Sequence, residues 1–213
     1  MNTMPKGSPE LTAARKEEII NACEKLYKTM SFKDITLKEI GNVTSFTRTS
    51  IYNYFQTKEE IFLALFEREY DRWNEALTDI LDSNESLTKN ALASKIAASV
   101  TEREQLLKLL AMNIYDMEAN SRPETLTSFK RAYGTSIHHL SRLLEKFCPE
   151  MSEDDIKRFL YMFFPFMFGI YPYTSVTDKQ KKAMEEAGIN YVYHSVYELT
   201  YSCLCRLLSA EHQ

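Results

Sequence analysis

The sequence has few helix breakers and no long apolar run: its 213 residues include only 5 glycines and 6 prolines. So few breakers among many Ala, Glu, Lys, Leu and Arg residues favour helices over strands. The most apolar stretch, residues 160–171, is interrupted by Pro165 and is too short to span a bilayer. The N-terminus also lacks the apolar segment of a signal peptide. We therefore expect an all-α, cytoplasmic protein of one or two domains that does not enter a membrane.

An excess of positive charge is absent as well. The formal net charge is −4 and the isoelectric point is about 5.7. No global field attracts nucleic acid, so any affinity for DNA must come from a local surface. The cysteines have no Cys-x-x-Cys or Cys–His spacing of the kind that zinc sites use, which favours reduced thiols; they are Cys23, Cys148, Cys203 and Cys205.

Motifs that carry catalysis are missing too. The sequence has no glycine-rich phosphate loop, no Gly-x-Ser-x-Gly elbow and no His-Glu-x-x-His motif. Adjacent His138 and His139 cannot both face one site from a regular helix, so surface and capping roles are favoured over a metal site. The polar set weighed for such a site is Asn113, Asp116, Glu118, His138, His139 and His194. We expect no enzymatic activity, no cofactor and no metal.

The N-terminal third contains a series of short helices with clear start signals. Residues 1–11 are polar and are expected to form a flexible arm. An amphipathic helix is predicted over residues 13–30, because its apolar residues follow helical spacing. Thr36 and Thr57 each open a capping box, and Thr47 caps a short helix between them. The predicted helices cover residues 36–43, 48–55 and 57–81, with a turn at residues 44–46.

The remainder alternates between helices and polar breaks. Helices are predicted over residues 125–147, 153–169, 178–186 and 189–208, the second ended or kinked near Pro165 and Pro172. The helices at 153–169 and 189–208 carry apolar residues on more than one face, so each must be buried on several faces. Pairing of both helices with their symmetry mates predicts a homodimer with a four-helix interface.

Residues 36–55 give the most informative pattern, two short capped helices joined by a tight turn. The second helix presents polar side chains near its start, as a helix that reads the major groove must do. Ile51, Tyr54 and Phe55 are placed to hold that helix to the core. From spacing alone, a solvent-exposed helical hairpin explains the pattern about equally well.

The segment from Ile40 to Phe55, followed by Thr57-Lys58-Glu59-Glu60-Ile61, resembles the DNA-binding domain of TetR-family repressors. The likeness covers about residues 12–62. It implies a DNA-binding regulator whose contacts with a palindromic operator come from Thr36, Thr47, Arg48, Thr49, Tyr52, Asn53 and Lys58. Two positions depart from the usual family pattern: Ser45 replaces the turn glycine and Gly41 replaces an alanine. Ser45 could therefore be strained, and Gly41 should soften its helix.

Further along, short segments resemble, more weakly, the helical ligand-sensing and dimerisation domain of the same family. They are Leu106–Leu110, Phe129–Ala132, Phe159–Leu160 with Gly169–Pro172, and the closing helix. We therefore expect a flexible arm at 1–11, a three-helix helix-turn-helix DNA-binding domain at 12–62, and a sensing domain at 63–213. Methionine and aromatic residues could line an apolar pocket for a small effector, although ordinary core packing is an open alternative. The candidates are Trp73, Met112, Tyr115, Phe129, Tyr133, Phe163, Met167 and Tyr171. The alternative function is a helical protein-interaction module that does not bind DNA.

Overall fold

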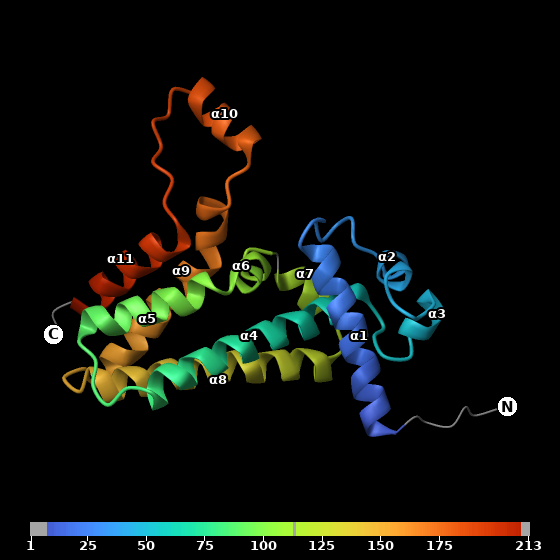
Figure 1. Cartoon of the computed structure of the whole chain (residues 1–213), viewed down its shortest axis with the longest axis horizontal. Coiled ribbons are helices and arrows are strands. Elements are labelled where there is room, and N and C mark those ends of the chain that lie inside the picture. The colour runs from blue at the N-terminus through green and yellow to red at the C-terminus, as the bar shows by residue number, and fades with distance from the viewer. Residues whose placement is uncertain (1–7, 113, 210–213) are drawn as a thin grey trace. The chain divides into compact units, whose positions relative to one another are not determined.

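The computed structural model describes residues 8–112 and 114–209, and within these residues it contains helices and no strand (Figure 1). The all-α prediction is confirmed. Asn113 and the first seven residues of the predicted arm lie outside the described residues. The helices are α1 (Pro9–Tyr27), α2 (Leu37–Asn42), α3 (Arg48–Ile51), α4 (Lys58–Asp82), α5 (Lys89–Thr101), α6 (Glu104–Leu110), α7 (Ile114–Ala119), α8 (Pro123–Phe147), α9 (Glu153–Thr174), α10 (Asp178–Glu186) and α11 (Val196–Ser209).

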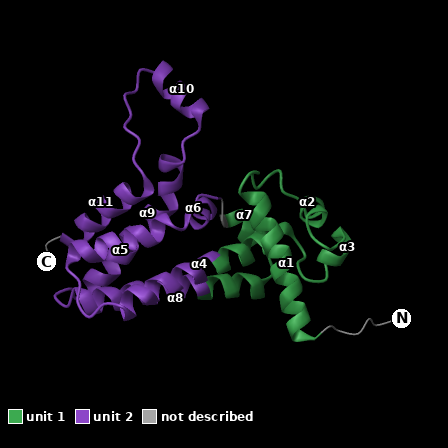
Figure 2. Ribbon diagram, in the orientation of Figure 1, with its two compact units in different colours: residues 1–68, 113–131 green, residues 69–112, 132–213 purple. Residues whose placement is uncertain are grey.

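The chain divides into two compact units (Figure 2). Unit 1 is Met1–Arg68 with Asn113–Arg131, and unit 2 is Glu69–Met112 with Ala132–Gln213. Helices α4 and α8 each begin in unit 1 and end in unit 2. The sequence placed the whole of 63–213 in the sensing domain. It did not show that 113–131 packs with the N-terminal helices, because that packing joins segments far apart in the chain.

Helix α1 begins earlier than predicted. Ser8 caps it, since its Oγ accepts a hydrogen bond from the Leu11 N–H at 3.2 Å, and Pro9 occupies the first helical position, where its missing N–H costs nothing. Residues 9–11 are therefore helical, which corrects the expected end of the arm. The helix ends at Tyr27, three residues before the predicted end at Met30.

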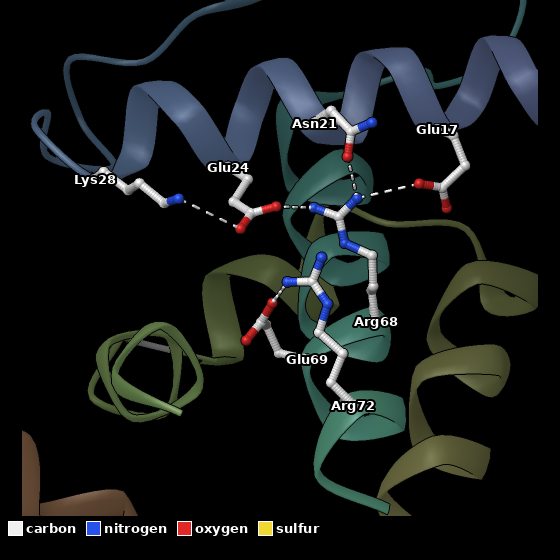
Figure 3. Close-up of polar contacts among 7 residues, drawn as sticks. All are labelled: Glu17, Asn21, Glu24, Lys28, Arg68, Glu69 and Arg72. Carbon is white, nitrogen blue, oxygen red and sulfur yellow. Dashed lines mark hydrogen bonds and ion pairs between the residues drawn. The ribbon is translucent and has the colours of Figure 1, made fainter. Parts of the chain in front are cut away.

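Helix α1 is held to α4 by both apolar and charged contacts. Ile19 and Cys23 are fully buried, and the Tyr27 ring meets Phe62 edge to face at 5.1 Å. Beside them, the Arg68 guanidinium donates to Glu17, Asn21 and Glu24 of α1 (Figure 3). The next turn of α4 carries a second pair, Arg72 with Glu69. A guanidinium with several acceptors fixes the register between two helices more firmly than apolar contact alone.

Unit 2 has an aromatic core. Trp73 is fully buried and donates from its indole N–H to Ser99 Oγ at 3.1 Å, so its polar atom is satisfied. The Phe164 ring of α9 meets Trp73 at 6.4 Å and Tyr133 of α8 at 5.0 Å, both edge to face. These contacts tie α4, α8 and α9 together. Helix α11 packs mainly against α5 and also against α9.

Two predicted helix boundaries in unit 2 are wrong. Helix α9 passes through Pro165 and Pro172 and ends at Thr174. Both prolines are exposed, so the backbone carbonyls that lose an intrahelical donor can bind water. Helix α11 begins at Val196 rather than at 189, because Ser195 and Glu198 form a capping box there. Helix α10 has its predicted bounds.

Helix α3 ends at Ile51 rather than at the predicted Phe55. The residues that follow form turns, in which the N–H groups of Tyr54 and Phe55 both bond to the Ile51 carbonyl at 2.9 and 3.0 Å. All four cysteines are free thiols, and burial raises the pKa of Cys23 to about 12. Within the described residues, no helix is both long and apolar enough to cross a membrane.

Candidate DNA-reading surface and apolar groove

Helices α2 and α3 begin at the predicted threonine caps, although at Thr36 only the threonine half of the predicted capping box is formed. Thr36 Oγ1 accepts from the Glu39 N–H at 3.3 Å, and Thr47 Oγ1 accepts from the Ser50 N–H at 3.2 Å. The turn between them contains Ser45, whose N–H donates to Glu18 Oε1 of α1 at 2.7 Å. No described residue other than a glycine has a positive φ, so the expectation of a strained Ser45 is wrong. The turn is therefore made without a left-handed residue, and the Glu18 carboxylate satisfies the Ser45 N–H.

The two faces of α3 differ as predicted. Ile51 is fully buried and Phe55 is 4% exposed, and both hold the helix to unit 1. Phe46 is buried and its ring contacts Tyr54 at 6.0 Å. Six of the seven predicted DNA contacts are exposed, namely Thr36, Thr47, Arg48, Thr49, Tyr52 and Asn53. An exposed polar face over an apolar anchor is what a helix needs to enter a groove without unfolding its own domain.

Arg48 and Tyr52 form a pair on this surface. One guanidinium N–H of Arg48 donates to Tyr52 Oη at 3.2 Å, and the Arg48 Cζ lies 5.9 Å from the Tyr52 ring centroid. The contact leaves other donors of the Arg48 guanidinium directed to solvent, where they could bind phosphate or a guanine edge. Such a pair restricts both side chains before they contact a binding partner, which lowers the entropy cost of binding.

Lys58 has a structural contact that the sequence did not reveal. Its Nζ donates to the backbone carbonyls of Phe32 at 2.8 Å and Ile35 at 3.1 Å, and it lies 4.1 Å from the Phe32 ring centroid. The ammonium therefore closes the loop between α1 and α2 onto the start of α4. An ammonium has three N–H donors, so one is left for a phosphate.

A second contact that sequence reasoning missed joins the start of α4 to the segment before α8. Glu60, fully buried in the first turn of α4, accepts from Arg122 Nε at 2.6 Å, Arg122 Nη2 at 2.9 Å and the Arg122 N–H at 3.1 Å. Burial raises the pKa of the Glu60 carboxyl, but the bonds from Arg122 and from the Gln56 N–H outweigh burial and leave it below the ordinary value. Thr57 Oγ1 also donates to the Asn120 carbonyl at 2.9 Å. The predicted capping box at Thr57 is only half formed: Thr57 Oγ1 accepts from the Glu60 N–H at 3.2 Å, but the Glu60 carboxylate bonds to the Gln56 N–H and to Arg122.

Unit 2 contains an apolar groove between α8 and α9, with a volume of about 520 Å³. Its inner wall is the aromatic core around Tyr133 and Phe164, and its rim carries the exposed side chains of Tyr161 and Lys157. A site of this size with few polar groups suits a small apolar ligand. The groove is lined by Tyr133, Ile137, Lys157, Leu160, Tyr161, Phe164, Pro165 and Phe168.

The predicted ligand residues are not brought together in this groove. Tyr133 lines it, whereas Trp73, Phe163 and Met167 are completely buried in the core of unit 2. Phe129 and Tyr115 belong to unit 1, where Phe129 packs against Phe66 at 4.8 Å and Tyr115 is 78% exposed. Met112 and Tyr171 are half-buried residues of unit 2. Ile137, Leu160 and Phe168 were missed because apolar spacing identifies a buried face without showing which part of it is left uncovered.

The polar set weighed for a metal is also dispersed. His139 Nδ1 lies 2.9 Å from Thr78 Oγ1, and Glu118 pairs with Lys130 at 2.8 Å. Over the described part of the chain, no group of three or more His, Cys, Asp or Glu side chains is arranged to hold a metal ion.

Comparison with known proteins adds the family context. Residues 67–195 match the family described as tetracyclin repressor-like, C-terminal domain. The chain is 28% identical over 145 residues to YfiR, an uncharacterized HTH-type transcriptional regulator of Bacillus subtilis. The matched region covers 67% of this chain and 69% of that relative.

Solved structures share the fold. The Thermus thermophilus FadR, a TetR-family transcriptional repressor in complex with lauroyl-CoA, superposes with a TM-score of 0.61 at 16% identity and covers 93% of this chain and 96% of that one. The Bacillus subtilis FadR in complex with stearoyl-CoA superposes with a TM-score of 0.57 at 17% identity. The match covers 92% of this chain and 99% of that one.

Proposed function

Because the chain belongs to the tetracyclin repressor-like family of transcriptional regulators, we propose that it is a repressor that binds a palindromic operator as a homodimer. A small apolar ligand releases it from that operator. The single observation that supports DNA binding best is the exposed polar face of α3, which is anchored by buried Ile51 and Phe55. Because the chain is acidic overall, this face and the residues around it must supply the affinity.

The DNA-binding proposal is tested by selecting from random duplexes in a gel-shift assay. We expect a palindrome to be enriched, since two symmetry-related reading helices contact two equivalent half-sites. Arg48→Ala and Tyr52→Ala should each weaken binding to that operator by about 1–3 kcal/mol, the usual contribution of a base contact. Lys28→Ala, an exposed substitution at the end of α1, is the matched control and should change little. Absence of binding at low salt would instead favour a protein-interaction module.

The groove between α8 and α9 supports an apolar ligand with one anionic end. Its walls are aromatic and aliphatic, and Lys157 stands at its rim. The Lys157 ammonium pairs with Glu153 at 2.8 Å, but both side chains are exposed, so that pair is weak and can yield to a ligand carboxylate or phosphate. The FadR relatives bind lauroyl-CoA and stearoyl-CoA, which makes long-chain acyl compounds the first class to examine.

Release follows if ligand changes the spacing of the two reading helices. Half-sites on one face of DNA lie roughly 34–36 Å apart. A small change in the distance between the two reading helices therefore prevents them from binding both half-sites at once. Helix α8 carries Tyr133 and Ile137 of the groove. It begins directly after Arg122, which bonds to Glu60 in the first turn of α4. A ligand that prefers the released conformer by about 1–3 kcal/mol lowers operator affinity roughly 5–150-fold.

The release mechanism is tested with acyl-CoA compounds of increasing chain length. Binding is first measured by thermal shift, and the operator complex is then titrated with each compound that stabilises the protein. Release at saturation is the expected result. A compound that binds fully and leaves operator affinity unchanged would exclude the mechanism, and one that tightens operator binding would reverse its sign.

The dimer is supported by apolar surface that the single chain leaves uncovered. On α9, Tyr161 is 81% and Met162 is 58% exposed, and on α11 Leu199 and Leu207 are only half-buried. Apolar faces on two neighbouring helices are typical of a symmetric four-helix interface. Light scattering at micromolar concentration should give the mass of a dimer, and a stable monomer would contradict the proposal.

A further inference from the structure

The turn between α2 and α3, at residues 44–46, has little of its own to hold it. The two helices have six and four residues, well below the length of about 12–15 residues at which an isolated helix becomes stable. The hydrogen bonds that residues 44–46 make with each other and with Gly41 are 3.2–3.4 Å long. The placement of α3 therefore depends on groups outside these two helices.

Helix α1 supplies the shortest hydrogen bond to this turn. Glu18 Oε1 accepts from the Ser45 N–H at 2.7 Å, across 27 residues of sequence. That bond holds the pKa of the Glu18 carboxyl below its ordinary value, so an ionised oxygen accepts it. Hydrogen bonds to an ionised group are roughly twice as strong as bonds between neutral groups.

A second residue of α1 holds the next position of the turn. The Arg15 Cζ lies 5.0 Å from the centroid of the buried Phe46 ring, within the range of a cation–π contact. Arg15 and Glu18 are three residues apart, so they lie on the same face of α1. Two neighbouring residues of the turn are thus tied to one face of one long helix.

A shift of this turn would pass directly to the start of α3. Ser45 stands two residues before the Thr47 cap and three before Arg48. The backbones of α2 and α3 approach so closely that a Cβ added at Gly41 would lie 3.4 Å from the Arg48 nitrogen and the Phe46 oxygen. Groups that bind a ligand specifically must be held within about 0.5 Å of their working positions. The tether from α1 therefore bears on base recognition as well as on stability.

The charge of Glu18 sharpens this argument. A carboxylate beside a surface that binds phosphates weakens binding through repulsion, and the chain already has a net charge of −4. If charge alone mattered, removing the Glu18 carboxylate would strengthen DNA binding. An acidic side chain at this position favours DNA binding only through the bond that it accepts. Charge and bond therefore predict opposite effects of substitution.

We propose that Glu18 is a positioning residue of the DNA-reading surface, whose bond to the Ser45 N–H sets the placement of α3 against the base edges. Arg15 assists it by holding Phe46 from the same face of α1. This inference rests on the DNA binding of the proposed function and adds to it a residue that lies outside α2 and α3.

Two substitutions in the full-length protein separate the bond from the charge. Glu18→Gln removes the charge and keeps an acceptor oxygen, whereas Glu18→Ala removes both. The alanine variant should bind the selected operator about tenfold more weakly than the parent, as expected for one misplaced base contact. Its affinity for non-specific duplex, which depends on phosphates, should not fall. The glutamine variant should recover operator binding.

Controls distinguish positioning from a structural role. Glu85→Ala removes an exposed carboxylate from unit 2 and should bind operator like the parent. Urea unfolding measures the stability of every variant, and binding is referred to the folded, active fraction. A residue that only stabilises the fold would change the unfolding free energy and leave the ratio of operator to non-specific affinity unchanged.

A double-mutant cycle with Arg48→Ala gives a second readout. If Glu18 places the helix that carries Arg48, then Arg48→Ala should weaken operator binding by a smaller factor in the Glu18→Ala background than in the parent. Independent, multiplicative losses would overturn the proposal, as would equal operator affinities of the alanine and glutamine variants. Both outcomes leave DNA binding intact. A parent chain that selects no operator would overturn the proposed function itself, and the role of Glu18 with it.

Discussion

Glu60 and Arg122 form a bidentate ion pair between two parts of unit 1 that are 62 residues apart in the chain. The Glu60 carboxylate is completely buried, whereas the Arg122 side chain is 43% exposed. Glu60 follows the reading helices and Arg122 precedes α8, the helix that lines the apolar groove. The pair therefore holds the segment before α8 to the start of α4 within unit 1.

Replacing Arg122 with alanine should destabilise the protein. The substitution leaves a buried carboxylate without its charged donor, which costs about 1–3 kcal/mol once the partial exposure of the arginine is allowed for. Urea unfolding measures the change. Glu60→Gln is the matched variant, because it keeps the side-chain volume and removes the charge, and it should cost less. Equal stability of Arg122→Ala and the parent would show that the pair contributes nothing.

Stability should also fall in acid because of Glu60. Its pKa is lowered on folding from the ordinary value of 4.5, so the folded state holds the carboxyl ionised more strongly than the unfolded state does. The resulting stabilisation is present above pH 4.5 and is lost as the pH falls through the folded-state pKa. Denaturant unfolding between pH 7 and pH 3, with Glu60→Gln for comparison, measures it. The parent should lose more stability than the variant over this range.

Gly41→Ala should stabilise unit 1 by about 0.5–1 kcal/mol, because alanine restricts the unfolded chain more than glycine does and favours the helix. An added Cβ would meet the backbone of Arg48 and Phe46 at 3.4 Å, an ordinary contact distance. Thermal unfolding should therefore shift upward. Gly41→Val tests the same space with two more methyl groups, and we expect it to lose the gain. A lower melting temperature for Gly41→Ala would mean that α2 and α3 cannot accept the contact.

Lys58→Ala should affect both stability and DNA binding. Loss of two hydrogen bonds to the Phe32 and Ile35 carbonyls costs about 1–2 kcal/mol of folding free energy, and loss of a phosphate contact reduces the salt dependence of DNA affinity by about one counterion. Denaturation and salt-dependent binding assays separate the two effects. Lys58→Arg keeps the charge and serves as the control. A variant that binds DNA with an unchanged salt slope would restrict Lys58 to its structural contact.

Ile137→Trp should block the groove without disturbing the reading surface. The side chain lines the groove and is half-buried, so the larger ring occupies the space of a ligand. We expect operator binding at the parent affinity and loss of the ligand response. His138→Trp, at the exposed neighbouring position on α8, adds the same ring outside the groove and should respond like the parent. An Ile137→Trp protein that is still released by ligand would place the site elsewhere.

The sequence by itself determined the local features of the reading surface. Thr36 and Thr47 start helices because their hydroxyls bond to N–H groups only three residues away, so the signal lies within one helical turn. The same local periodicity identified Ile51 and Phe55 as anchors and left Arg48 and Tyr52 exposed. The capping signal at Ser195 was present in the sequence too, and it would have corrected the predicted start of α11.

Only the tertiary structure decided which distant groups meet. The bond of Lys58 to the loop at Phe32, the pairing of Glu60 with Arg122 and the support of Ser45 by Glu18 join segments 26 to 62 residues apart. No local pattern encodes such contacts. The chain holds many polar residues that could serve as partners, and only the packing of the helices selects among them. The groove likewise depends on which apolar side chains α8 and α9 leave uncovered. The spacing of apolar residues predicts which face of a helix is buried. Which part of that face stays uncovered depends only on how the helices pack.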